Sequence, residues 1–152
     1  MWKLSNKGRY AVRALSDIAF HEDGQPAQIK DIAKRQRIPL RFLEQIFQDL
    51  KRAGLVGSKR GPRGGYQLAR GAADIRVGDV LRAIEGPPDS ARIKQEARRA
   101  PKELCEVADT VVEELAQAVE RCFEGVTIED VCTRGERLGL RRRVRPLSAY
   151  VI

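Results

Sequence analysis

Apolar residues recur at helical spacing along most of this 152-residue chain, and residues 55–68 depart from that pattern. Two strand-like runs, Leu55-Val56 and Tyr66-Gln67-Leu68, flank the segment 59–65, which holds three cations, three glycines and a proline. Glycine and proline between two short strands are typical of a β-hairpin. We therefore expect a mainly α-helical fold with one small β element.

Helices are expected on both sides of this hairpin. Their ranges, from the spacing of apolar residues, are 6–21, 28–36, 40–53 and 75–84. Ile38-Pro39 separates the second helix from the third, and Pro39 suits the first position of a helix, where a missing N–H costs nothing. Gly54 is well placed to end the third helix.

The third helix is amphipathic and could address DNA. Its polar face carries Arg41, Glu44, Gln45, Gln48 and Lys51. Arginine, glutamine and glutamate side chains can hydrogen-bond base edges. A short helix, a tight break and a second amphipathic helix predict a helix-turn-helix, whose second helix can enter the major groove. An ordinary pair of packed helices is the alternative interpretation.

The hairpin that follows is basic. Arg60 and Arg63 can reach the DNA backbone or the minor groove, and Gly64 and Gly65 permit positive φ or a close approach to a sugar-phosphate strand. A basic hairpin directly after a helix-turn-helix predicts a wing, and a solvated hairpin without a ligand is the simpler alternative.

Positive charge is concentrated in the first half of the chain, whose formal net charge as a whole is +8. Residues 1–70 hold 15 Lys and Arg against 6 Asp and Glu, whereas residues 71–152 hold 14 against 15. Such an excess is typical of a surface that neutralises phosphates, although a solubility face would give it too. Residues 103–130 hold nine acids and one base, so we expect them to face solvent or a partner.

A long helix is expected over residues 102–124, with an apolar seam at coiled-coil spacing. The seam consists of Leu104, Ala108, Val111, Leu115, Ala118 and Cys122. Little chain follows to cover this seam, so we expect a homodimer, whose two-fold symmetry would match a palindromic DNA site. Thr127 and Asp130 have the spacing of a cap for a short final helix.

The expected domain organisation has four parts. They are a winged helix-turn-helix domain at 1–86, a linker at 87–101, a dimerisation helix with a short following helix at 102–133, and a basic, irregular tail with an apolar C-terminus at 134–152.

The sequence offers little material for catalysis. It has one histidine, His21, which closes the first helix and suits the helix dipole, and neither a phosphate-binding glycine loop nor a serine elbow is present. We therefore expect no enzyme. The apolar stretches are far shorter than the ~20 residues that cross a bilayer, and no signal segment opens the chain, so we expect a soluble, cytoplasmic protein.

Several motifs together resemble the Rrf2 family of bacterial winged-helix transcription regulators. They occupy residues 4–11, 43–45, 53–56, 60–66, 77–80, 83–86 and 125–131. The resemblance implies a homodimer in which long helices cross and two winged domains sit on successive major grooves of double-stranded DNA.

The resemblance also implies roles for individual residues. Arg41, Phe42 and Glu44 match the base-reading end of the recognition helix. Arg60 matches the wing arginine, and Lys7 and Arg9 lie in a segment near the DNA backbone. With the neighbours found above, the candidate DNA-binding residues are Lys7, Arg9, Arg41, Phe42, Glu44, Gln45, Arg60 and Arg63.

Cysteines decide whether a cofactor is expected. Cluster-binding members of the family carry three closely spaced cysteines, whereas residues 87–101 of this chain contain none. Cys105 and Cys122 would lie ~25 Å apart on one helix and differ by ~100° around its axis, so they cannot share a cluster within one chain. We expect no cofactor and a packing role for the cysteines. Thiol sensing or an iron-sulfur cluster shared across the dimer, involving Cys105, Cys122 or Cys132, are the alternatives.

These observations predict a sequence-specific DNA-binding transcriptional regulator, a repressor that acts as a homodimer on a palindromic operator. The alternative is a protein-interaction adaptor that binds a protein effector through its acidic helix and apolar C-terminus, with DNA binding secondary. An RNA-binding module is disfavoured, because Tyr66 and Phe42 are the only aromatic residues in the basic half suited to stacking.

Overall fold

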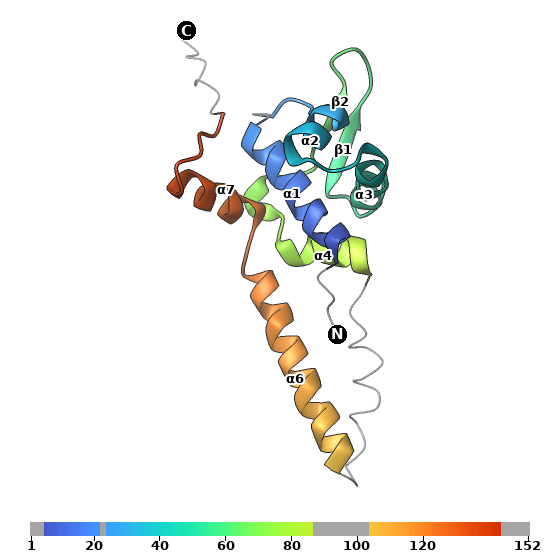
Figure 1. Cartoon of the computed structure of the whole chain (residues 1–152), viewed down its shortest axis with the longest axis vertical. Coiled ribbons are helices and arrows are strands. Elements are labelled where there is room, and N and C mark those ends of the chain that lie inside the picture. The colour runs from blue at the N-terminus through green and yellow to red at the C-terminus, as the bar shows by residue number, and fades with distance from the viewer. Residues whose placement is uncertain (1–4, 22–23, 87–103, 144–152) are drawn as a thin grey trace.

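The computed structural model describes residues 5–21, 24–86 and 104–143 (Figure 1). In chain order the elements are α1 Asn6–His21, α2 Ile29–Gln36, α3 Leu40–Arg52, β1 Val56–Lys59, β2 Gly65–Leu68, the 3-10 helix η1 Ala72–Asp74, α4 Val77–Glu85, α6 Leu104–Glu124 and α7 Ile128–Arg137. The expectation of a mainly helical winged helix-turn-helix is confirmed. The expected linker at 87–101 and the apolar C-terminus lie outside the described residues.

Helix α1 forms the centre of the domain, because α2, α3, α4, α7 and β2 all pack against it. Its inward residues Ala11, Ala14 and Leu15 are fully buried. Figure 1 shows α6 as one long rod that starts at its far end and runs back to this head, where α7 follows and lies beside α1.

A left-handed residue makes the tight break between α2 and α3. Arg37 ends α2 with φ 54° and ψ 47°, and the N–H of Ile38 donates to the Ala33 carbonyl at 3.0 Å. Pro39 caps α3 rather than filling its first helical position, since its ψ of 131° is not helical. Its carbonyl accepts from the N–H groups of Phe42 and Leu43, both at 3.0 Å.

The two wing strands pair antiparallel, with Val56 opposite Leu68 and Lys59 opposite Gly65. A short bridge ties them to the segment before α2, because Ala27 and Tyr66 exchange two backbone hydrogen bonds of 2.7 Å. Beneath the wing, the fully buried Phe47 ring of α3 lies 4.4 Å from the Tyr66 ring, centroid to centroid. The wing is therefore fixed to α3 and to the segment that precedes α2.

The helix expected over 75–84 begins two residues later than predicted, at Val77. Ile75 is buried in an extended conformation, and its carbonyl accepts from the N–H of Ile128 at 2.9 Å. The N–H of Val77 donates to the Val126 carbonyl at 2.8 Å. These bonds join the start of α4 to the start of α7.

The prediction of an irregular segment from residue 134 is wrong for its first four residues, because α7 continues to Arg137. Thr127 caps the helix as predicted: its hydroxyl accepts from the N–H of Asp130 at 3.1 Å. The backbone N–H of Thr127 and its hydroxyl lower the pKa of Asp130 in return. Ile128 and Cys132 are buried where α7 packs against α1.

We expect Phe47→Ala to lower the free energy of unfolding by about 4 kcal/mol, because the lost ring leaves a cavity beneath both α3 and the wing. Urea denaturation followed by circular dichroism measures this change. Leu138→Ala is the control, since Leu138 is 79% exposed and its loss should cost less than about 0.5 kcal/mol. Equal effects of the two substitutions would contradict the assignment of Phe47 to the shared core.

Candidate nucleic-acid interface

The two faces of α3 divide as the sequence predicts. Leu43, Ile46, Phe47 and Leu50 are fully buried against the head. Arg41, Glu44, Gln45 and Gln48 are exposed on the opposite face. Because the inner face is locked in the core, the outer face is presented to the surroundings on a rigid support.

Phe42 lies at the edge of this face and is half-buried. Its ring meets the ring of Tyr10 on α1 edge to face, with 5.7 Å between centroids. A depression of about 430 Å³ lies between the starts of α1 and α3, lined by Asn6, Tyr10, Pro39, Arg41, Phe42 and Gln45. The structure thus brings three of the candidate DNA-binding residues, Arg41, Phe42 and Gln45, together around one hollow.

Lys7 has a partner within the protein. Its Nζ lies 2.7 Å from Oδ2 of Asp49 and ties α1 to α3. Arg52 also reaches Asp49, at 3.2 Å. Lys7 therefore orients α3, whereas Arg9 is exposed on α1.

The turn of the wing exposes Arg60 and Arg63. Positive φ, one of the two predicted reasons for its glycines, is found at Gly65. A Cβ on Gly64 would overlap the Lys59 carbonyl, and a Cβ on Gly65, where φ is +152°, would overlap the Ala27 carbonyl. Within the protein, both glycines therefore allow a close approach of two backbone segments.

Lys51 links recognition helix and wing, because its Nζ donates to the Ser58 hydroxyl of β1 at 2.6 Å.

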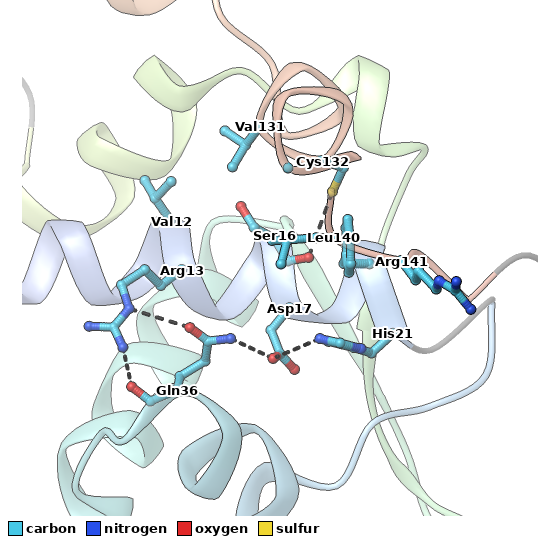
Figure 2. Close-up of a pocket in the computed structure, with 12 residues that line it drawn as sticks. Val12, Arg13, Ser16, Asp17, His21, Gln36, Val131, Cys132, Leu140 and Arg141 are labelled. Atoms are coloured by element: carbon cyan, nitrogen blue, oxygen red, sulfur yellow. Dashed lines mark hydrogen bonds and ion pairs between the residues drawn. The ribbon is translucent and has the colours of Figure 1, made fainter. Parts of the chain in front are cut away.

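A buried carboxylate, which sequence reasoning missed, anchors α2 on α1 (Figure 2). The Asp17 side chain is wholly inaccessible and accepts from Arg35 at 2.7 Å and from Gln36 at 2.6 Å. His21 Nε2 lies 3.9 Å from Oδ1 of Asp17, and Arg13 donates to the side chain of Gln36 at 3.3 Å. The available signal was an acid four residues before His21, on a helix whose other charged residues are basic.

Comparison with known proteins decides the family. The model of the Rrf2 family, described as iron-dependent transcriptional regulators, matches residues 4–134. The chain belongs to the Rrf2 family. Its relatives are transcriptional regulators with a helix-turn-helix, so DNA binding and not catalysis is the activity of this family.

Two curated relatives indicate the extent of the likeness. The regulator IscR of Vibrio atlanticus is 37% identical over 141 residues, which cover 93% of this chain and 81% of the relative. The protein rrf2 of Nitratidesulfovibrio vulgaris is 40% identical over 129 residues, covering 85% of this chain and 86% of the relative.

Two solved structures share the fold. The structure of T. potens IscR superposes with a TM-score of 0.75 at 34% identity, covering 92% of this chain and 93% of that one. The structure of CymR, the global cysteine regulator of B. subtilis, superposes with a TM-score of 0.72 at 31% identity, covering 88% of this chain and 98% of that one.

The long helix of this Rrf2 protein has an uncovered apolar side. Leu104 is 83% exposed and Leu115 is 63% exposed. Val111, Ala108 and Cys122 are also exposed, and Ala118 is half-buried. No helix in the described parts of the chain is long and apolar enough to span a membrane.

Glutamate side chains near the end of α6 form ion pairs with arginines of the same chain. This corrects the expectation that the acidic helix faces only solvent or a partner. Arg82 of α4 pairs with Glu124 and lies 3.9 Å from Glu120, and Arg76 lies 3.5 Å from Glu124. The hydrogen bond to Glu124 raises the pKa of Arg82. Burial opposes ionisation of Asp79, yet the Arg76 N–H and the Arg82 guanidinium lower its pKa overall.

The Rrf2 family description raises the question of a metal. Cys122 is exposed on α6, whereas Cys132 is buried on α7 with its thiol 3.7 Å from the Ser16 carbonyl, and burial raises the pKa of that thiol. Within residues 5–21, 24–86 and 104–143, no three His, Cys, Asp or Glu side chains are grouped to hold a metal ion. The Cys105 side chain lies outside the described residues.

We expect Gly65→Ala to weaken DNA binding and to lower the free energy of unfolding by about 2 kcal/mol, because the added Cβ breaks the bridge between Ala27 and Tyr66. Gly57→Ala is the matched control, since no atom lies within 4 Å of a Cβ at that position in the same wing. Thermal unfolding and fluorescence anisotropy with a DNA duplex measure both effects. A Gly65→Ala protein indistinguishable from the control would contradict the close approach.

Proposed function

We propose that this Rrf2-family protein is a homodimeric repressor that binds a palindromic operator. The observation that carries the proposal is the exposed polar face of α3 beside a basic wing, both held by one buried core. A helix presented in this way fits the major groove, and a basic turn next to it fits the flanking backbone.

The exposed side chains suit two different tasks. Arg41, Glu44 and Gln45 lie on the outer face of α3, where guanidinium, carboxylate and amide groups can pair with base edges. Arg9, Arg60 and Arg63 are exposed cations, suited to phosphates or the minor groove. Phe42 and Lys7 support this surface from its edge through Tyr10 and Asp49.

Dimerisation would occur through α6. The seam residues lie on the side of α6 opposite Glu120 and Glu124, about half a turn away around the helix axis. The helix can therefore bind α4 of its own chain and a second copy of α6 at once. Such a dimer would place two α3 helices for a two-fold symmetric site, and occupation of a promoter site by both would exclude other proteins.

We further propose that DNA binding needs no resident metal or cluster and takes place in the cytoplasm. Leu138 and Leu140 are 79% and 62% exposed beyond α7, which favours a protein effector as a second partner there. Such an effector would leave the α3 face free.

The salt dependence of binding tests the division of tasks. If each protomer neutralises about four phosphates, the logarithm of the association constant should fall with the logarithm of salt concentration with a slope of about −7 per dimer. Arg60→Ala should reduce the slope to about −5, because two contacts per dimer are lost. Glu44→Ala should keep the slope and change the preferred sequence, as measured by selection from a random duplex library.

A wild-type slope near zero would contradict DNA binding through phosphates. Identical changes of slope and preferred sequence in the two variants would contradict the separate roles of wing and recognition helix.

The oligomeric state tests the seam. Leu115→Glu should convert a dimer at micromolar concentration into a monomer and weaken operator binding at least tenfold, because two carboxylates would be buried against each other. Glu114→Gln is the control, since this exposed residue lies about 100° away around the helix. Sedimentation equilibrium makes the measurement, and a monomeric wild-type protein would refute the dimer.

A further inference from the structure

A pocket of about 370 Å³ lies between α1 and α7, next to the end of α2 (Figure 2). We call it the α1–α7 pocket. Its lining residues are Val12, Arg13, Ser16, Asp17, Phe20, His21, Gln36, Val131, Cys132, Gly135, Leu140 and Arg141. The volume is in the range that holds small metabolites.

One side of the α1–α7 pocket is apolar and partly aromatic. Val12, Val131 and Leu140 contribute aliphatic surface, and the rings of Phe20 and His21 meet edge to face with 5.3 Å between centroids. Gly135 also lines this side, where a Cβ would be in ordinary van der Waals contact with Leu140 at 3.4 Å and with Phe20 at 3.5 Å. Such a surface suits a flat ring.

The other side of the pocket is polar and carries excess positive charge. Arg141 supplies an exposed guanidinium group, whereas the guanidinium of Arg13 already donates to Gln36. The carboxylate of Asp17 is engaged by Arg35 and Gln36. The Ser16 hydroxyl oxygen is buried, and the described residues offer it no hydrogen-bond partner. A buried unpaired hydroxyl is unfavourable, so a ligand that brings a polar atom here gains affinity.

The pocket also contacts two functional elements of the protein, the helix-turn-helix and the helix α7. Asp17 and Gln36 belong to the network that holds α2 of the helix-turn-helix on α1. Val131 and Cys132 belong to α7, which follows the proposed dimerisation helix. An occupant contacts both elements at once, and it can bias their relative placement if its affinity differs between two arrangements.

We propose that the α1–α7 pocket binds a small aromatic carboxylate and that its occupancy changes the affinity of the protein for its operator. The aromatic ring contacts Phe20, Val131 and Leu140, and the carboxylate faces the guanidinium group of Arg141. The effect of occupancy on operator affinity rests on the proposed DNA-binding function, whereas binding of the carboxylate in the pocket does not.

Isothermal titration of the full chain with indole-3-acetate, and with neutral indole-3-acetamide for comparison, tests binding of the carboxylate in the pocket. We expect indole-3-acetate to bind with a dissociation constant below about 1 mM and the amide to bind at least about tenfold more weakly. Arg141→Gln should weaken binding of the acid about tenfold and leave the amide unchanged. Arg134→Gln, an exposed cation of α7 outside the pocket, is the control.

Val131→Trp should abolish binding by filling the pocket, and circular dichroism checks that this partly exposed position tolerates the change. No binding of indole-3-acetate, equal binding of the amide, or full binding by both Val131→Trp and Arg141→Gln would overturn the proposal.

The effect of the pocket on DNA binding is tested by measuring the affinity for the operator with and without saturating indole-3-acetate. We expect a change of at least about threefold in the wild type and none in Val131→Trp. Unchanged affinity despite binding of the acid would overturn only the effect of occupancy on operator affinity. A protein that binds the acid and no DNA would refute the proposed function and leave the pocket assignment standing.

Discussion

The arrangement of the DNA-binding domain depends on one buried carboxylate. Asp17 is the only charged side chain that is buried in the described parts of the chain. Removing a carboxylate from water is costly unless donors replace the lost hydration. Arg35 and Gln36 supply those donors from the last turn of α2, so the helix is stable in the single orientation that satisfies Asp17. The tight break at Arg37 then transmits that orientation to α3.

The wing is fixed by a different principle, which is the pairing of backbone groups. The bridge between Ala27 and Tyr66 adds a third short segment to the two wing strands. A two-stranded hairpin is marginal in water, and this extra pairing together with the contact between Phe47 and Tyr66 stabilises it. Recognition helix and wing therefore share supports, and disturbing either one affects both.

Local chemistry explains which features could be predicted from the sequence. Gly54 and the pair Thr127 and Asp130 mark helix ends through bonds within a few residues, and the apolar stripe of α3 is set by its own spacing. These features were predicted correctly. The Rrf2 family and the winged fold followed from short motifs in the same way.

Contacts between distant residues explain what was missed. The partners of Asp17 lie on another helix, and Lys7 finds Asp49 across 42 positions of sequence. Ile75 is extended because its carbonyl accepts a hydrogen bond from the N–H of Ile128. Helix α7 continues beyond its predicted end because it packs on α1. Neither periodicity nor composition carries such information, because these long-range contacts exist only in the completed tertiary structure.

The junction between α4 and α6 makes the long helix a lever. With 21 residues, α6 extends for ~31 Å, so a tilt of only ~10° where it meets Arg82 would displace its far end by ~5 Å. In a two-fold assembly, the angle at that junction governs the separation of the recognition helices, which must match the ~34 Å repeat of the double helix. In the proposed dimer, the contacts of Arg82 with Glu120 and Glu124 would therefore set the distance between the two recognition helices.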